Sequence, residues 1–318
     1  IIAAVSLFTS GLLQVAIGFQ ASPVVGVAVL LVIVSILLTT GRYKALERLT
    51  KFVVIGFTLL TTLCMLLVVE RLDWSVSAFS LPAFDMPTMI FVVALIGFMP
   101  SPTDASVLQS LWTVAKANQS GRRASKDESR FDFNVGYVTS CVLAVFFLFL
   151  GTAVLYGGGI EMPTDNAGFA RRLLEVYTSL IGDWSYYFIA VTALFVMLST
   201  TLTVTDGMTR MAVAIGAETS PNENWNSNSR YGIVLMILCF SALLVIQLLL
   251  SSFTRFMDMT SVIVFLIGPF LAWLNHKAIF SDEIEKEKQP SKIIRIWSIV
   301  SIVSLFALMA VYVYFRLV

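Results

Sequence analysis

Residues 88–116 read TMIFVVALIGFMPSPTDASVLQSLWTVAK, and this stretch decides which fold the chain can adopt. Its first half is continuously apolar, and the run MPSPTD at 99–104 then interrupts it. Pro100 and Pro102 have no N–H to donate, so a regular helix cannot pass through this run unchanged. The stretch therefore predicts two short helices that meet at an unwound point.

The interruption frees the backbone carbonyls of Ile96 and Phe98, because the residues four positions further on are prolines. In hydrocarbon, such carbonyls are tolerated only where protein, water or a ligand satisfies them. Ser101 suits a helix N-cap, Pro102 suits the first helical position and Asp104 completes a capping pattern, so the second helix is predicted to begin there. Transporters use such breaks to bind ions, because freed carbonyls supply oxygen ligands.

Two side chains at the break are candidates for chemistry. Met99 offers a thioether, a soft metal ligand that Ca²⁺ and Mg²⁺ do not seek, although packing is the commoner role of a methionine. Asp104 is the one ionisable residue well inside a predicted span, which makes it a functional candidate beside its role as a helix cap. A polar stripe at helical spacing follows and predicts a face toward a wet cavity. The members of this stripe are Thr103, Ser106, Ser110 and Thr113.

The composition predicts an integral membrane protein. Of 318 residues, 58% are hydrophobic and only 13% are charged, and the mean hydropathy is +0.86. An ordinary soluble domain is about half apolar and about a quarter charged. The net charge of +1 gives no indication of a nucleic-acid partner. One histidine and three cysteines without a short spacing argue against a His/Cys zinc site, and we expect no cofactor.

The apolar stretches predict about nine transmembrane helices, since a span takes about 20 residues. They lie at 1–19, 22–40, 52–69, 88–115, 132–156, 185–205, 231–250, 257–275 and 293–315. If the loops alternate sides, 16 of the 21 Lys and Arg residues fall on the side of the loop at 41–51. The positive-inside rule therefore predicts that this loop is cytoplasmic.

Other segments carry polar residues near the ends of spans. Residues 164–180 have mixed polarity and a helix-start signal, which predicts a short helix on the outer surface. The sixth span ends in a run of hydroxyl residues followed by Asp206, which we expect to lie in water at the cytoplasmic end. The eighth span opens with Thr260 and Ser261 and contains Pro269, which predicts a wet, bent helix.

Several of these segments resemble one known family. The run ALIGFMP at 94–100, inside the interrupted helix, resembles the sixth transmembrane helix of the Nramp family of divalent metal-ion transporters. Residues 41–48 (GRYKALER) resemble the family's loop between its fourth and fifth helices. Residues 268–272 and 274–275 resemble the end of its tenth helix. The nine spans fit helices three to eleven, so the resemblance covers essentially the whole chain.

The resemblance implies an all-α polytopic membrane protein with a LeuT-like inverted-repeat transporter fold that lacks its first two helices. Residues 1–318 would form a single transmembrane transporter domain, with 1–69 as the remainder of the first repeat and 88–275 as the second repeat. Residues 293–315 would form an additional C-terminal helix. The chain begins without an initiator methionine, so we expect a piece of a longer protein that does not transport by itself.

The resemblance also implies a metal site. In the family, the metal is held by the methionine thioether and a nearby carbonyl on the sixth helix, and by an Asp and an Asn on the first helix, which this chain lacks. Carried over to this sequence, the ligands are Met99 and the carbonyl of Ile96. A polar group of the tenth helix also approaches the metal in the family, and Thr260 or Ser261 is the nearest match.

The sequence departs from the family at two histidines that are tied to proton coupling. Ser101 replaces the one after the Met-Pro pair, and Ser106 corresponds roughly to the second. Asp104 is the residue that could titrate in their place. Retention of Met99 favours Mn²⁺ or Fe²⁺ as the substrate, whereas the divergence resembles branches that take a harder ion such as Mg²⁺. The expected partners are the lipid bilayer, a divalent ion and protons, and the expected location is the cell (inner) membrane.

Two other functions compete with this interpretation. An amino-acid or other small-solute transporter on the same scaffold would bind a carboxylate through free N–H groups. The prolines remove such donors, and Asp104 repels carboxylates. An intramembrane enzyme would need a Ser/His pair, paired aspartates or an H-E-x-x-H motif, and the sequence offers none of these. We therefore expect a transporter and not an enzyme.

Overall fold

The computed structural model describes most of the chain. The described residues are 1–18, 20–40, 44–72, 74–75, 85–156, 162–220, 225 and 228–317, and of these the side chains of 44–50, 119, 120 and 317 are not described. Of the motif at 41–48 that contributed to the family resemblance, residues 41–43 therefore lie outside the described residues, and 44–48 begin a helix whose first side chains are not described.

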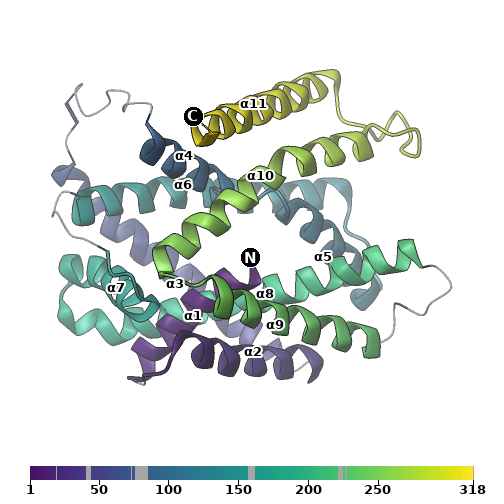
Figure 1. Ribbon diagram of the computed structural model, residues 1–318. Helices are drawn as coiled ribbons and strands as arrows, with labels where there is room; N and C mark the ends of the chain where they lie inside the picture. The colour runs from purple at the N-terminus through teal and green to yellow at the C-terminus, as the bar shows by residue number, and fades with distance from the viewer. Residues whose placement is uncertain are drawn as a thin grey trace. The chain divides into compact units, whose positions relative to one another are not determined.

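The secondary structure of the described residues is helical throughout (Figure 1). The α-helices are α1 (Ile2–Ile17), α2 (Pro23–Thr40), α3 (Lys44–Val68), α4 (Met86–Phe98), α5 (Ala105–Ser120), α6 (Lys126–Leu150), α7 (Asn166–Ile181), α8 (Tyr186–Thr219), α9 (Asn228–Leu249), α10 (Phe253–Ile279) and α11 (Lys292–Leu317). Two short 3₁₀ turns, η1 (Val69–Arg71) and η4 (Asp183–Ser185), and a π-helical segment, η3 (Gly151–Tyr156), adjoin them.

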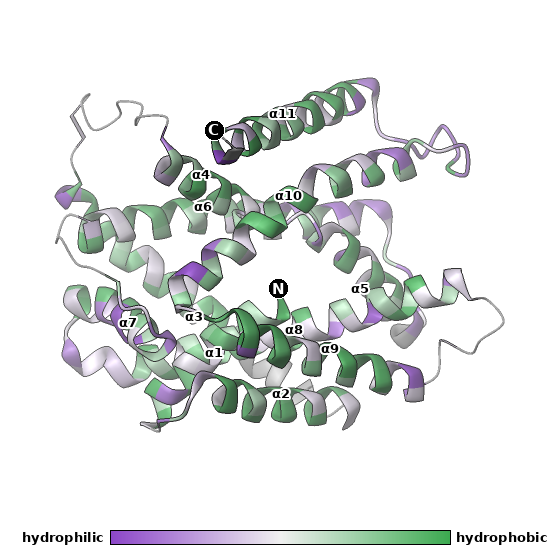
Figure 2. Ribbon diagram, in the orientation of Figure 1, coloured by the Kyte–Doolittle hydropathy of each residue, from purple (hydrophilic) through white to green (hydrophobic). Residues whose placement is uncertain are grey.

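Seven helices in the described part of the chain are long and apolar enough to cross a membrane, and α1 and α4 are shorter apolar helices. Each predicted span corresponds to one of these helices, and α4 together with α5 accounts for the fourth span. Hydrophobic residues run along the long helices, and hydrophilic ones gather toward their ends (Figure 2). The prediction of an all-α, polytopic integral membrane protein is confirmed.

The helix boundaries correct one sequence-based prediction. The sixth span was expected to end near residue 205, but α8 continues to Thr219. Its sequence contains no proline, so nothing in its backbone stops the helix earlier. Asp206 and Arg210 therefore lie inside a helix of 34 residues, not in a cytoplasmic loop.

The chain divides into two compact units. Unit 1 comprises Ile1–Trp74 and Leu108–Met257, and unit 2 comprises Ser75–Val107 and Asp258–Val318. The division passes through α5 and α10, which each contribute to both units. The two units are defined by contacts between residues and say nothing about internal symmetry. The repeats predicted at 1–69 and 88–275 therefore stay a prediction.

In unit 1, α1 packs against α2, α7 and α8. Its buried face includes hydroxyl groups, and Thr9 Oγ1 lies 2.8 Å from Thr201 Oγ1 on α8. Ser10 Oγ accepts a hydrogen bond of 3.1 Å from Asn166 Nδ2 at the start of α7. Interhelical hydrogen bonds of this kind join helices in membranes, where lipid is as apolar as the side chains.

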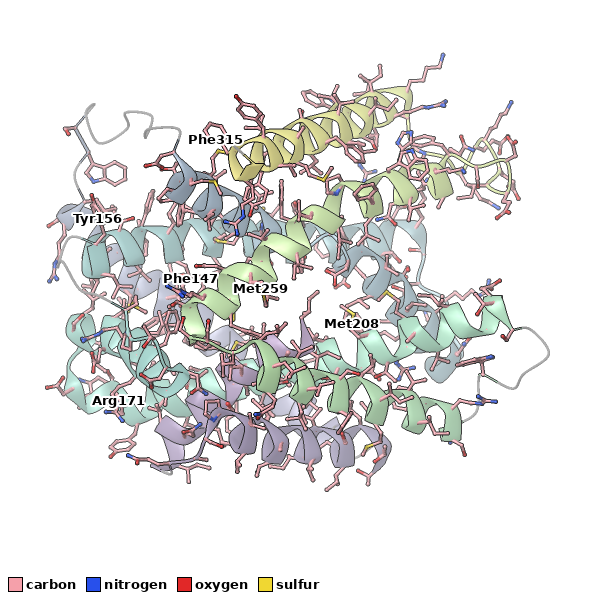
Figure 3. All side chains as sticks on the ribbon, in the orientation of Figure 1. Phe147, Tyr156, Arg171, Met208, Met259 and Phe315 are labelled. Atoms are coloured by element: carbon pink, nitrogen blue, oxygen red, sulfur yellow. The ribbon has the colours of Figure 1, made fainter. Side chains whose placement is uncertain are left out.

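The short helix predicted at 164–180 is present as α7, which is amphipathic. Asp165 caps it by accepting a hydrogen bond of 2.7 Å from Gly168 N–H. Ala170, Leu174 and Tyr177 are buried on one face, whereas Arg171 is exposed on the other (Figure 3). Burial raises the pKa of Tyr177, so its hydroxyl stays protonated. The location of α7 at the outer membrane surface stays a prediction.

Unit 2 is built on the packing of α4 with α10 and α11. Its core cluster contains Met89 and Val93 from α4, Phe265 from α10 and Tyr312 from α11. Asp85 caps α4 by accepting a hydrogen bond of 2.9 Å from Thr88 N–H, and its hydrogen bonds to Thr88 hold the pKa of the Asp85 carboxyl below its usual value. This packing fixes the position of the first half of the interrupted helix.

The Thr9–Thr201 contact gives a first testable prediction. Thr9→Val should lower the free energy of unfolding by about 0.6 kcal/mol, the average for an interhelical hydrogen bond in a membrane protein. Thr62→Val is the matched control, because among the described residues the Thr62 hydroxyl bonds to Thr58 O of its own helix, at 2.8 Å, and to no other helix. Unfolding midpoints in detergent should fall for Thr9→Val alone. An equal fall in both variants would contradict a stabilising role of the interhelical contact.

Candidate metal-ion site at the interrupted helix

The interruption predicted from the prolines is present between α4 and α5. Helix α4 ends at Phe98, and Met99 is extended, with φ −110° and ψ 137°. The Met99 N–H still donates to Leu95 O at 2.8 Å, so α4 keeps its hydrogen bonds up to this residue. Pro100, Ser101 and Pro102 then lie outside both helices. They separate the two halves by a turn that no regular helix spans.

The restart of the helix differs from the prediction. The capping pattern placed Pro102 at the first helical position, but α5 begins at Ala105. The intervening turn closes by i→i+3 hydrogen bonds, with Ala105 N–H donating to Pro102 O at 3.0 Å and Val107 N–H donating to Asp104 O at 3.0 Å. Such tight turns are common at helix ends, and here one delays the regular α-helix by one turn.

The predicted ligands lie on the α4 side of the break. Ile96 occupies the last turn of α4, three residues before Met99, and its carbonyl loses its usual donor because position 100 is proline. Ile96 is 37% exposed and Met99 is half-buried. A carbonyl oxygen and a thioether are therefore within one helical turn of each other along the chain, next to irregular backbone.

Helix α10 lies against α4 beside these residues. A β-carbon at Gly97 would be 2.5 Å from the Ser261 carbonyl oxygen, so the two backbones approach closely enough to require a glycine. Thr260 and Ser261 are both buried, with 8% of each exposed. Helix α10 continues through Pro269 without a break in its helical assignment. The structure thus brings the candidate residues of α10 next to the last turn of α4.

The start of α5 is also held to α10. Asn275 Nδ2 donates to Ser106 Oγ at 2.7 Å, and Ser106 Oγ donates to Thr103 O at 2.6 Å. A β-carbon at Gly268 would lie 3.2 Å from Thr103 Oγ1. The sequence did not predict the Asn275 contact, because a pair 169 residues apart leaves no local pattern. Ser106 is thereby part of the packing of α5, whatever its role in coupling.

Asp104 lies at the N-terminal end of α5 and is buried, with 9% exposed. Its Oδ1 atom has no hydrogen-bond partner in the part of the chain that the structure describes. A buried carboxylate oxygen without a partner is costly, because burial removes its hydration. The exposed face of α5 carries Ser106 and Thr113, two members of the predicted polar stripe.

The donor set differs from that of a conventional protein metal centre. Among the described residues, no group of three or more His, Cys, Asp or Glu side chains could hold a metal ion. The atoms at the break are instead backbone carbonyls, hydroxyls, one carboxylate and one thioether. This set suits transient binding of a passing cation better than a structural metal.

Sequence reasoning missed a second polar cluster, around Asp206 on α8. The residue was expected in water, but its side chain is 16% exposed and accepts hydrogen bonds from Trp112, Arg210 and Tyr231. No local signal marks this cluster, because the absence of proline between 186 and 219 predicts a longer helix but not which side chains meet Asp206.

Together, the helices and the break define a polytopic α-helical membrane protein whose fourth span is split by an irregular turn. Comparison with protein families then identifies the chain: residues 1–315 match the Nramp family, described as natural resistance-associated macrophage protein-like. The chain belongs to the Nramp family of membrane transporters, which are not enzymes, and membership implies the LeuT-like fold.

One curated relative is the uncharacterized protein PM0681 of Pasteurella multocida (strain Pm70). It is 33% identical over 216 residues, which cover 66% of this chain and 49% of the relative. The chain thus spans about half the length of the curated relative that it matches. Its name gives no function, so the substrate has to be inferred from the site.

The contact between Gly97 and Ser261 gives a second prediction. Gly97→Ala should lower the free energy of unfolding by about 1–3 kcal/mol, because the new methyl group would overlap the Ser261 carbonyl and push α4 from α10. Gly136→Ala is the matched control, since a β-carbon there meets nothing within 4 Å. Thermal unfolding in detergent should separate the two variants. An unchanged midpoint for Gly97→Ala would show that α4 and α10 are not packed so closely.

Proposed function

We propose that this chain is the main part of a secondary transporter for a divalent metal ion, Mn²⁺ or Fe²⁺ with Mg²⁺ as the alternative. The observation that carries the proposal is the interruption at Met99–Asp104, where two prolines take away the usual amide donors of the Ile96 and Phe98 carbonyls next to the Met99 thioether. Family membership supports the same interpretation. The ion would bind at the break, and alternating access would carry it across the membrane.

The proposed ligands are Met99 Sδ and the carbonyl oxygen of Ile96, with Thr260 or Ser261 as additional contacts. Oxygen ligands alone would favour a hard ion such as Mg²⁺ or Ca²⁺, whereas a thioether adds affinity for softer ions. Met99 therefore acts as the selectivity element in this proposal. The ionisable residue nearest to the break along the chain is Asp104, which is acidic and would attract a cation, not repel it.

The Met99 proposal predicts a change in selectivity. In the full-length protein reconstituted into proteoliposomes, Met99→Ala should raise the Mn²⁺ concentration for half-maximal uptake at least about tenfold, since even outer-shell changes weaken metal sites by about that factor. Competition by Mg²⁺ and Ca²⁺ should become stronger at the same time. Met89→Ala, in the α4 core, is a control for loss of a buried methionine.

The wild-type result decides the function itself. If the wild-type protein takes up Mn²⁺ and Met99→Ala does so with the same ion selectivity, the thioether is excluded as a ligand, but metal transport is still supported. Absence of uptake for every divalent ion tested would overturn metal transport, and amino-acid uptake by the same protein would then be the measurement to make.

We propose that Asp104 carries the coupling proton. It is buried at the start of α5, and a carboxylate oxygen without a partner is suited to take up a proton on one side of the membrane and release it on the other. Ser106 cannot titrate in the physiological range, so its part in coupling would be to orient the turn that carries Asp104.

The Asp104 proposal gives a prediction about pH. If metal and protons enter together, wild-type uptake should rise as the external pH falls, because the inward proton gradient then increases. Asp104→Asn cannot exchange the proton, so its uptake should lose most of this pH dependence. Asp258→Asn is the control, since Asp258 is an exposed acid in the same unit. A wild-type pH profile in Asp104→Asn would exclude Asp104 as the coupling group.

A further inference from the structure

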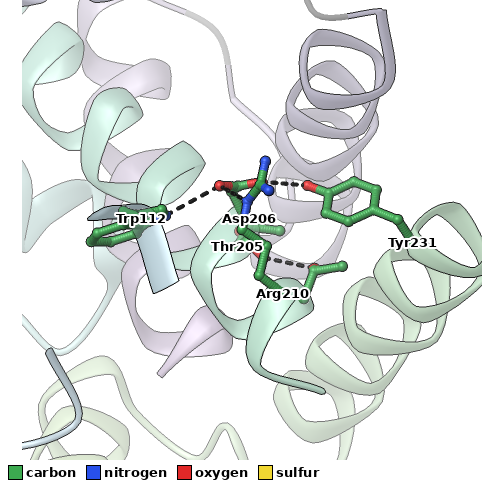
Figure 4. A network of polar contacts seen from close by, with 6 residues as sticks. Trp112, Thr205, Asp206, Arg210 and Tyr231 are labelled. Atoms are coloured by element: carbon green, nitrogen blue, oxygen red, sulfur yellow. Dashed lines mark hydrogen bonds and ion pairs between the residues drawn. The ribbon is translucent and has the colours of Figure 1, made fainter. Parts of the chain in front are cut away.

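A cluster around Asp206 joins three helices of unit 1 (Figure 4). Asp206 Oδ2 accepts hydrogen bonds from Trp112 Nε1 on α5 at 3.2 Å and from Arg210 Nε on α8 at 2.8 Å. Asp206 Oδ1 accepts one from the Tyr231 hydroxyl on α9 at 2.7 Å. A single carboxylate in an apolar helix therefore connects α5, α8 and α9.

Two of these donors hold the carboxylate in place. Arg210 lies one turn further along α8 and forms an ion pair with Asp206, and its guanidinium carbon is 5.7 Å from the centre of the Tyr231 ring. Arg210 and Tyr231 thus contact both the carboxylate and each other. Charged partners and a shared aromatic contact restrict the rotation of the Asp206 side chain.

The third donor, Trp112, reaches α5. Its ring packs directly on α8, since a β-carbon at Gly207 would be 2.9 Å from Trp112 Cζ2 and 3.1 Å from the Leu108 methyl groups. The indole therefore packs closely against the backbone of α8 at Gly207 and also donates a hydrogen bond to the neighbouring Asp206. Such a combination fixes the rotation and the distance of α5 relative to α8.

Helix α5 is the second half of the interrupted helix. Trp112 lies six residues after Ser106, or about 9 Å along the axis. Any rotation of α5 would move Asp104 and the turn that precedes it, and small misplacements of ligands are expensive in binding and turnover.

We propose that Asp206 is a positioning residue for ion transport. It holds α5 through Trp112 and thereby sets the position of the turn at residues 99–104. This inference rests on the proposed metal transport, but it concerns residues that contact no proposed ligand.

The first test is Mn²⁺ uptake by the full-length protein with Trp112→Phe, which keeps an aromatic ring at this position but removes the indole N–H together with part of the ring. The Mn²⁺ concentration for half-maximal uptake should rise about tenfold, as expected for the loss of one hydrogen bond to a charged group. Tyr231→Phe removes one of the two donors that hold the carboxylate but leaves Arg210 and the Trp112 contact in place, so it should raise this value less than Trp112→Phe does.

Two further variants separate positioning from general damage. Trp297→Phe alters an exposed tryptophan on α11 and should have no effect. Asp206→Ala combined with Trp112→Phe should be no worse than Asp206→Ala alone, because both changes remove the same contact. Additive losses would contradict the proposed link, and a wild-type half-saturation value in Trp112→Phe would overturn it.

A second test does not depend on transport. Thr113→Cys places a thiol on the exposed face of α5, in a protein whose Cys141 is replaced by serine, while Cys64 and Cys239 are buried. A water-soluble maleimide should label this thiol faster when Trp112→Phe or Asp206→Ala releases α5, and at the original rate with Trp297→Phe.

The two tests distinguish a failure of the proposed function from a failure of the proposed positioning role. If the wild-type protein takes up no divalent ion, the proposed function is overturned, whereas faster labelling would still support the anchoring of α5. If the wild-type protein transports and the variants label at the original rate, the positioning role of Asp206 is overturned. If Trp112→Phe does not fold, Asp206→Ala is used for both measurements.

Discussion

The constraint behind this structure is that backbone polar groups in a membrane need a partner. Uninterrupted helices meet it by themselves, and nearly all of the described chain does so. The exception within a predicted span is the turn at 99–104, where two prolines take away the usual amide donors of the Ile96 and Phe98 carbonyls. Such a turn persists only inside a protein that packs around it, and the close approach of α10 at Gly97 provides part of that packing.

The two halves of the interrupted helix are held in different ways. Helix α4 packs against α10 and α11 through apolar side chains and the glycine contact. Its position therefore depends on how the shapes of these side chains fit together. Helix α5 is held by polar contacts, from Asn275 at its first turn and from Asp206 two turns later. Apolar packing tolerates few alternatives, whereas hydrogen bonds can be exchanged for others at small net cost. A transporter needs an element of each kind, since one side of the site has to keep its geometry while another changes.

The proposed site contains few of the residues by which metal centres are usually recognised. Carbonyls, hydroxyls and a thioether bind cations weakly compared with clusters of Cys and His, and weak binding suits an ion that has to leave again. The replacement of the family's histidines by Ser101 and Ser106 leaves Asp104 as the ionisable group closest in sequence to the break. Metal selectivity and coupling would then depend on two neighbouring but separate side chains, Met99 and Asp104.

The sequence by itself determined the helical class, the spans and the break, because bilayer thickness, apolar length and the chemistry of proline are local properties. It also indicated α7, whose cap and amphipathic pattern lie within one segment. Only the tertiary structure decided that Ser261 lies against Gly97, that Asn275 bonds to Ser106 and that Asp206 is packed instead of hydrated. Each of these contacts joins residues far apart in the chain, and an isolated aspartate near a helix end looks the same in sequence whether water or a tryptophan meets it. The physical reason is that burial and pairing depend on which helices become neighbours, which no local pattern specifies.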